Sequence, residues 1–158
     1  MKKKIYLETS FISYLTGSLS RDLVVVANQQ VTQEWWFKRK EEFALFISEF
    51  VIQESQRGDT QASNKRILVL ESLPILETNE ASVDLPEKFI KSKIIPKKAI
   101  QDSLHIAIAT VHEMNYLLTW NCSHIANAEI QKGILKICLA EGYEMPTICT
   151  PNELMVGK

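Results

Sequence analysis

The stretch KAIQDSLHIAIATVHEMNYLLTWN, from Lys98 to Asn121, decides the fold. It reads as a buried helix, a turn and a buried strand, because its apolar residues first recur at helical spacing and then form a short continuous run. The helical stripe consists of Ile100, Leu104, Ala107, Ile108 and Val111. Since residues 104–109 are apolar on almost every side, we expect this helix to be covered on more than one face.

A second face of the same helix carries Asp102 and, one turn later, His105. A carboxylate in such apolar surroundings is costly unless its charge is compensated. We expect Asp102 to be compensated by a bound ion or by hydroxyl donors such as Ser10 and Thr119.

The strand of this stretch is expected at residues 116–120, after a helix stop at Asn115. Thr119 and Asn121 close the strand. Polar residues at the carboxyl end of a strand lie where open α/β sheets place their ligands. This end of the strand is therefore a candidate part of a site.

Strands and helices alternate along the whole chain. Strands are expected at residues 4–8, 43–47, 74–77, 116–120 and 147–149. Helices are expected at residues 11–15, 19–40, 48–58, 62–72, 98–115 and 127–141. Five such alternations predict an α/β fold, a three-layer α/β/α sandwich with a central, mostly parallel five-stranded sheet.

Residues 79–93 interrupt this regular pattern. Pro86 cannot continue an ideal helix, because it lacks a backbone N–H and its ring clashes with the preceding turn. We expect either a kinked helix or two pieces, the second capped by Asp84.

Length and composition predict one globular domain over residues 1–158, with 46% hydrophobic and 23% charged residues. A net charge of −1 gives no overall attraction to nucleic acid.

No apolar run approaches a membrane span, and MKKKIYLE leads directly into a strand, so we expect no membrane association. Three cysteines without C-x-x-C spacing favour reduced thiols and a cytoplasmic protein: Cys122, Cys138 and Cys149.

Three acids stand at element junctions: Glu8 ends the first strand, Glu54 follows the second, and Asp102 opens the central helix. The carboxyl ends of parallel strands meet at one edge, so these acids are expected to converge there, beside Asn121. A divalent cation such as Mg²⁺ would relieve their repulsion and support hydrolysis of phosphodiesters. Read singly, each acid is also compatible with a capping or solvated position.

Four segments, in this order, resemble the motif blocks of the PIN-domain family: YLETSFISYL, SEFVIQESQRG, DSLHIAIA and LLTWN. Toxin ribonucleases of toxin–antitoxin (VapC-type) pairs are small members of this family. The resemblance implies a PIN-like fold, a Mg²⁺ or Mn²⁺ ion, RNA as the substrate, a cognate antitoxin as a partner, and a homodimer. The resemblance further implies that the protein is the toxin of a type II toxin–antitoxin pair.

Residue by residue, the resemblance assigns the first acid to Glu8, the second to Glu54 and the third to Asp102. These three would hold the metal, and Asn121 takes the fourth catalytic position. Ser10 and Thr119 become polar supports of the site.

Two of these positions depart from the family pattern, because Glu8 and Asn121 stand where Asp is usual. The longer arm of Glu8 shifts a ligand against the near-ideal octahedron of Mg²⁺, and an uncharged Asn121 weakens a second ion. We therefore expect one tightly held ion. The alternative is a catalytically weakened PIN-like RNA-binding module. A phosphorylated receiver domain is excluded, because only Glu8 and Glu77 occupy its acid positions.

His105 is a candidate supporting residue of the site, or else a buried histidine bonded to the backbone. Cys122 and His124 flank Asn121, but two such residues do not make a zinc site. The apolar residues of 19–36 exceed what one sheet face requires, which also favours a homodimer.

Lysines crowd one short region with only Glu87 opposing them: Lys88, Lys91, Lys93, Lys97 and Lys98. Phosphate contacts need cations beside the acidic cleft, so Arg57, Lys97 and Lys98 are predicted to bind RNA. The alternative is an ordinary solvated helix face.

Overall fold

A computed structural model describes residues 1–156 of the protein. Its strands are β1 (Lys3–Leu7), β2 (Phe43–Ser48), β3 (Ile75–Leu76), β4 (Tyr116–Leu118) and β5 (Thr147–Cys149). They form one sheet in the order β3-β2-β1-β4-β5, and every neighbouring pair is parallel. In the centre of the sheet, Ile5 pairs with Leu45 on one side and with Tyr116 on the other.

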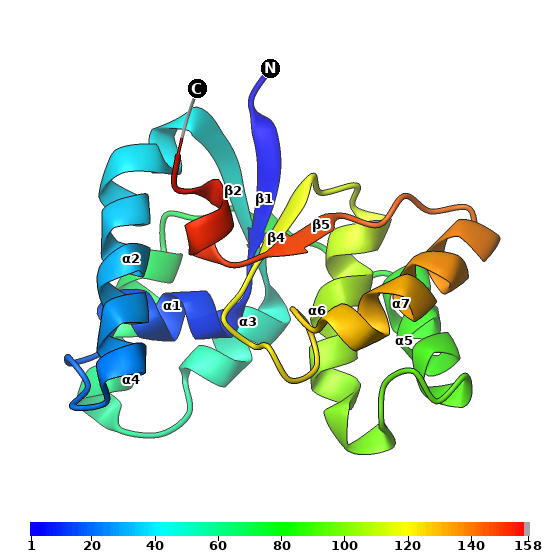
Figure 1. The fold of residues 1–158 in the computed structure, drawn as a ribbon, viewed down its shortest axis with the longest axis horizontal. Helices are drawn as coiled ribbons and strands as arrows, with labels where there is room; N and C mark the ends of the chain where they lie inside the picture. The colour runs from blue at the N-terminus through cyan, green and yellow to red at the C-terminus, as the bar shows by residue number, and fades with distance from the viewer. Residues whose placement is uncertain (157–158) are drawn as a thin grey trace.

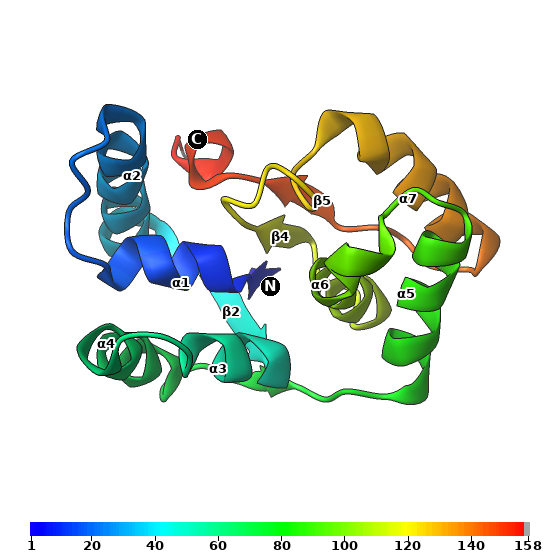
Figure 2. The ribbon, with the colours of Figure 1, turned by 90° about the horizontal axis from the view of Figure 1, so that it is seen from below.

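Helices cover both faces of the sheet, as Figure 1 and Figure 2 show. One layer contains α1 (Thr9–Thr16), α2 (Leu23–Arg39) and α4 (Thr60–Leu70), with α3 (Glu49–Ser55) beside α1 and α4. The other contains α5 (Glu80–Lys91), α6 (Ile100–Val111) and α7 (Ala128–Ala140). Short 3-10 turns occur at Lys40–Glu42, Lys97–Ala99 and Pro151–Leu154. The predicted three-layer α/β/α sandwich is confirmed, with a fully parallel sheet.

Helix α2 begins later than the apolar pattern predicts. The spacing predicts a helix from residue 19, but Oδ1 of Asp22 accepts hydrogen bonds from the backbone N–H groups of Val24 and Val25, each at 3.0 Å. Asp22 is therefore the N-cap of a helix that starts at Leu23.

Helix α5 runs through Pro86 as one element, so the expectation of two pieces with Asp84 as a cap is wrong. Asn79 and Ser82 form a reciprocal capping box that fixes the start of the helix. Leu85, Pro86 and Phe89 are buried on its inner face. Burial of this face and the strong cap outweigh the hydrogen bond that proline removes.

Helix α6 is buried on several sides, as its sequence predicts, but it ends at Val111 rather than near Asn115. Glu113 adopts the left-handed conformation with φ 57°. Asn115 instead anchors β4 to β1: its N–H donates to Lys4 O at 2.9 Å, and its Oδ1 accepts from Lys4 N at 2.8 Å.

The core contains large side chains from both layers. Trp35 of α2 is completely buried, in edge contact with Phe11 at 5.6 Å and stacked on Phe43 at 5.8 Å between ring centroids.

Within residues 1–156, none of the helices combines the length and apolar character that crossing a membrane requires.

The parallel topology brings the carboxyl ends of the strands to one edge of the sheet. Glu8 N donates to Leu118 O at 3.1 Å, and Thr119 N donates to Cys149 O at 3.0 Å. The residues that follow β1 and β4 are therefore neighbours, although they are far apart in the sequence.

Candidate metal centre

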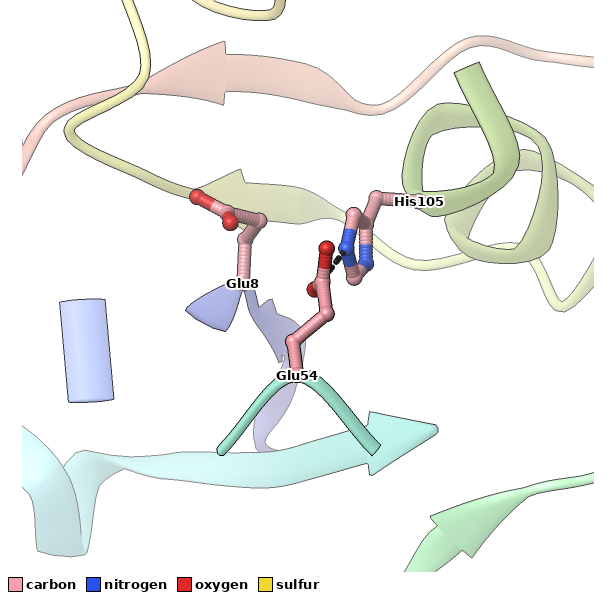
Figure 3. Close-up of side chains that lie close together, drawn as sticks. All are labelled: Glu8, Glu54 and His105. Atoms are coloured by element: carbon pink, nitrogen blue, oxygen red, sulfur yellow. Dashed lines mark hydrogen bonds and ion pairs between the residues drawn. The ribbon is translucent and has the colours of Figure 1, made fainter. Parts of the chain in front are cut away.

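Glu8, Glu54 and His105 come from three different elements and meet at this edge of the sheet. One ligand atom of each lies within 4.8 Å of the other two. In Figure 3, the Glu54 carboxylate and the His105 ring point toward each other, and Glu8 reaches from the end of β1 toward β4. The convergence follows from the topology, because β1, α3 and α6 all have an end at this edge.

Glu8 is held by donors on both of its carboxylate oxygens. Its Oε2 accepts from Ser10 N at 3.0 Å, and its Oε1 accepts from Ser10 Oγ and from Thr119 Oγ1, each at 2.5 Å. Glu8 is therefore also the N-cap of α1, and only 5% of its surface is exposed. Ser10 and Thr119, the predicted polar supports, therefore both donate to Glu8 and neither donates to Asp102.

Glu54 accepts two hydrogen bonds on one oxygen. Nε2 of His105 lies 2.6 Å from Oε1, and the Thr9 hydroxyl donates to the same atom. Burial is the largest influence and raises the pKa of Glu54. The hydrogen bonds from His105 and Thr9, with the positive charges of His105 and Arg57, outweigh burial and leave the pKa below its usual value. Glu54 is thus a carboxylate at neutral pH.

His105 is completely buried, and both of its ring nitrogens have side chains as hydrogen-bond partners. The alternative from the sequence was a buried histidine bonded to the backbone. Nδ1 lies 2.6 Å from the Tyr6 hydroxyl, which lies 2.7 Å from Ser48 Oγ. Burial acts to lower the pKa of His105, but the Glu54 hydrogen bond and nearby carboxylates raise it above the usual value. Burial also raises the pKa of Tyr6 well above its usual value, so this hydroxyl keeps its proton.

Asp102 lies in the first turn of α6 and is engaged on both oxygens by the loop after β4. Oδ1 accepts from Asn121 Nδ2 at 3.0 Å, and Oδ2 lies 3.1 Å from His124 Nδ1. A carboxylate can only accept, so Nδ1 of His124 carries the proton of this contact. Asn121 Oδ1 also accepts from the backbone N–H groups of Ser123 and His124. The compensation of Asp102 therefore comes from Asn121 and His124, and the expected hydroxyl donors were the wrong ones.

The predicted RNA-binding cations are exposed: Arg57, Lys97 and Lys98. Arg57 is near enough to Glu54 to lower the pKa of that carboxylate. The expected lysine cluster is less basic than its sequence suggests, because Lys88 of α5 forms an ion pair with Glu141, at the end of α7.

Tyr6, Thr9 and His124 contact the proposed site residues, and sequence reasoning did not assign them to the site. Tyr6 stands two residues before Glu8, so both side chains lie on one face of the strand. That spacing is a usable signal. The contact of His124 with Asp102 depends on the fold of a loop, and no periodic pattern predicts it.

The donor set fits a hard divalent cation. Glu8 and Glu54 offer carboxylate oxygens close together in a partly buried place, where two negative charges repel unless they are compensated. Oε2 of Glu54 forms no hydrogen bond within residues 1–156 and remains available to an ion. Asp102, the third acid that was expected to converge here, is not among the residues whose ligand atoms gather within 4.8 Å, although its negative charge helps to raise the pKa of His105.

Solved structures share this fold. VapC20 from Mycobacterium tuberculosis, described as a Sarcin-Ricin loop cleaving toxin, aligns with a TM-score of 0.52 and 14% identity over 89% of this chain and 96% of that one. A chain of VapBC2 from Rickettsia felis, in a structure bound to a DNA fragment from their promoter, aligns with a TM-score of 0.55 and 15% identity over 93% and 98%.

No protein-family model matches the sequence, and no curated protein sequence matches it. The two structural likenesses confirm the PIN-like, VapC-type fold that the sequence resemblance implies.

Proposed function

We propose that this protein is a divalent-metal-dependent endoribonuclease that hydrolyses RNA phosphodiesters. The observation that carries the proposal is the convergence of Glu8 and Glu54 at the carboxyl edge of a parallel sheet. The likeness to a structure described as a Sarcin-Ricin loop cleaving toxin supports the same activity.

Glu8, Glu54 and Asp102 would hold the ion, directly or through its water ligands. When bound, the ion would polarise a phosphate oxygen and lower the pKa of a water that attacks phosphorus. Ser10 and Thr119 hold Glu8 in place, and Asn121, the fourth member of the proposed catalytic set, holds Asp102.

Arg57, Lys97 and Lys98 are the proposed contacts to the RNA backbone. They are exposed, and Arg57 lies near the acidic residues. Cations beside the carboxylates would offset the repulsion between an acidic site and the phosphates.

The biological role that we propose is that of the toxin in a type II toxin–antitoxin pair. The VapBC2 likeness supports a cognate antitoxin as the protein partner. Free thiols at Cys122, Cys138 and Cys149 suit the proposed cytoplasmic location.

Removal and return of the metal tests the activity. We expect purified protein to cleave a structured RNA in Mg²⁺ or Mn²⁺, to lose cleavage in EDTA, and to regain it when the ion is restored. Attack by a metal-activated water, unlike attack by the neighbouring 2′-hydroxyl, forms no 2′,3′-cyclic phosphate, so the end groups of the products should include none. Cleavage that persists in EDTA, in a preparation free of contaminating nuclease, would contradict the proposal.

The second candidate is an RNA-binding module with little activity. It is favoured by Asp102, whose two oxygens are already occupied by Asn121 and His124. RNA binding without cleavage at any Mg²⁺ or Mn²⁺ concentration would support this candidate over the nuclease.

A homodimer is a further part of the proposal. Helix α2 and the segment before it expose large apolar side chains: Leu19 by 59%, Leu23 by 83%, Val24 by 70% and Phe37 by 80%. Leu19, Leu23 and Val24 are close in the sequence, and exposed apolar side chains that gather in one place mark an interface, whereas isolated ones do not. We expect a dimeric mass by light scattering at high micromolar concentration. Substituting Leu23 and Val24 by Ser should shift the mass to a monomer, and a parent protein that is monomeric would contradict the prediction.

A further inference from the structure

A chain of side-chain hydrogen bonds leads from β2 through the core to Glu54. Ser48 Oγ lies 2.7 Å from the Tyr6 hydroxyl, that hydroxyl lies 2.6 Å from Nδ1 of His105, and Nε2 of His105 lies 2.6 Å from Oε1 of Glu54. Ser48, Tyr6 and His105 are completely buried. Buried polar groups are costly unless each is paired, and every member of this chain is paired.

The direction of the bond to Glu54 is fixed by chemistry. A carboxylate only accepts hydrogen bonds, so Nε2 of His105 must carry the proton between them. This holds for the neutral ring and for the imidazolium. On its other side, a neutral ring accepts from the Tyr6 hydroxyl at Nδ1, and a charged ring donates to it. The rotatable hydroxyls of Tyr6 and Ser48 satisfy both arrangements.

We propose that His105 is a positioning residue, held by Tyr6 and Ser48 so that its Nε2–H orients the Glu54 carboxylate, and that it is not a metal ligand. A ligand nitrogen needs a free lone pair directed at the ion. His105 has none to offer, because Nε2 carries a proton and Nδ1 faces Tyr6. This inference rests on the proposed metal centre.

The same arrangement selects the oxygen that Glu54 presents. His105 and Thr9 both occupy Oε1, which leaves Oε2 for the ion. Groups that orient a metal ligand in this way typically account for 10–100-fold in metal affinity. The ion would then have an all-oxygen protein shell, as Mg²⁺ prefers.

Two substitutions of His105 separate positioning from ligation. In His105→Gln, the amide nitrogen lies about where Nε2 lies and can still donate to Glu54, whereas in His105→Asn it lies about where Nδ1 lies. We expect His105→Gln to bind Mn²⁺ with nearly the parent affinity by calorimetry, and His105→Asn to bind it about 10–100-fold more weakly. Equal losses in both variants, or parent-like binding in both, would overturn the proposal.

Removal of the Tyr6 hydroxyl tests the support behind His105. Tyr6→Phe should weaken Mn²⁺ binding by about tenfold, at a temperature where circular dichroism shows the variant folded. Tyr14→Phe is the matched control, because the Tyr14 ring stacks on Trp120 and its hydroxyl makes no hydrogen bond within residues 1–156. A purely structural role would lower the melting temperature of Tyr6→Phe and leave the affinity unchanged, which would contradict the proposal.

A third test observes the proton on Nε2 of His105 directly. It uses the parent protein, so it requires neither a folded variant nor RNA. In ¹⁵N-histidine-labelled parent protein saturated with Mg²⁺, we expect Nε2 of His105 to remain protonated in nitrogen–proton correlation spectra. A deprotonated Nε2 in the saturated protein would make His105 a ligand and overturn the proposal. A protein that binds the ion and cleaves no RNA would instead end the ribonuclease proposal alone.

Discussion

Replacing Glu54 by Gln is expected to reduce metal-dependent RNA cleavage by at least about 100-fold, which corresponds to about 2.7 kcal/mol of transition-state stabilisation. The amide oxygen of the glutamine can still accept from His105 Nε2, so the buried hydrogen-bond chain and the fold should persist. The negative charge that attracts the ion is lost. Single-turnover cleavage rates in saturating Mg²⁺ measure the effect, and circular dichroism checks the fold.

Glu49→Gln is the matched control for this experiment. Glu49 lies in the first turn of the same helix, α3, and is exposed, so the same chemical change leaves the proposed site untouched. We expect this control to cleave at the parent rate. Glu54→Gln protein that cleaves as fast as the parent, with contaminating nuclease excluded, would place the active centre elsewhere.

The layers of the fold could be predicted from the sequence because each strand and helix buries a regular apolar pattern. Strand β5 was predicted with its observed bounds, and the sequence of α6 correctly indicated a helix buried on several sides. Helix ends were less predictable. The apolar pattern predicts that α2 starts at residue 19. The helix starts at Leu23 instead, because the side chain of Asp22 caps it there. In α5, the burial of residues around Pro86 outweighs the tendency of proline to interrupt a helix.

Part of the candidate site was also predictable. Parallel strands end at one edge, so the topology alone places Glu8 and Glu54 near each other. The contacts among side chains were not predictable in the same way. The sequence offers Ser10 and Thr119 as hydroxyl donors without showing which acid they contact, and only the packed structure shows that both donate to Glu8. The engagement of Asp102 by His124 likewise depends on the path of the loop after β4.

Replacing Asn121 by Asp is expected to make the stability of the protein depend strongly on the bound ion. Asn121 Nδ2 donates to Asp102 Oδ1 at 3.0 Å, and an aspartate there has no donor to offer. Two like charges about 4 Å apart near a protein surface repel by about 4 kcal/mol. His124, on the other oxygen of Asp102, relieves part of this repulsion. We therefore expect the metal-free variant to melt at a lower temperature than the parent.

With the ion bound, the variant should melt at a higher temperature than the parent, because the second carboxylate gives the ion an additional charged ligand. Each tenfold gain in affinity adds about 1.4 kcal/mol of stability at a fixed saturating ion concentration. Calorimetric melting with EDTA and with Mg²⁺ measures both states. The double variant Asp102→Asn/Asn121→Asp exchanges the acid and the amide, so the hydrogen bond can re-form and the metal-free melting temperature should return to that of the parent. If Asn121→Asp alone were as stable as the parent in EDTA and gained no more from Mg²⁺, residue 121 would lie outside the ion's reach, and its proposed place in the catalytic set would be wrong.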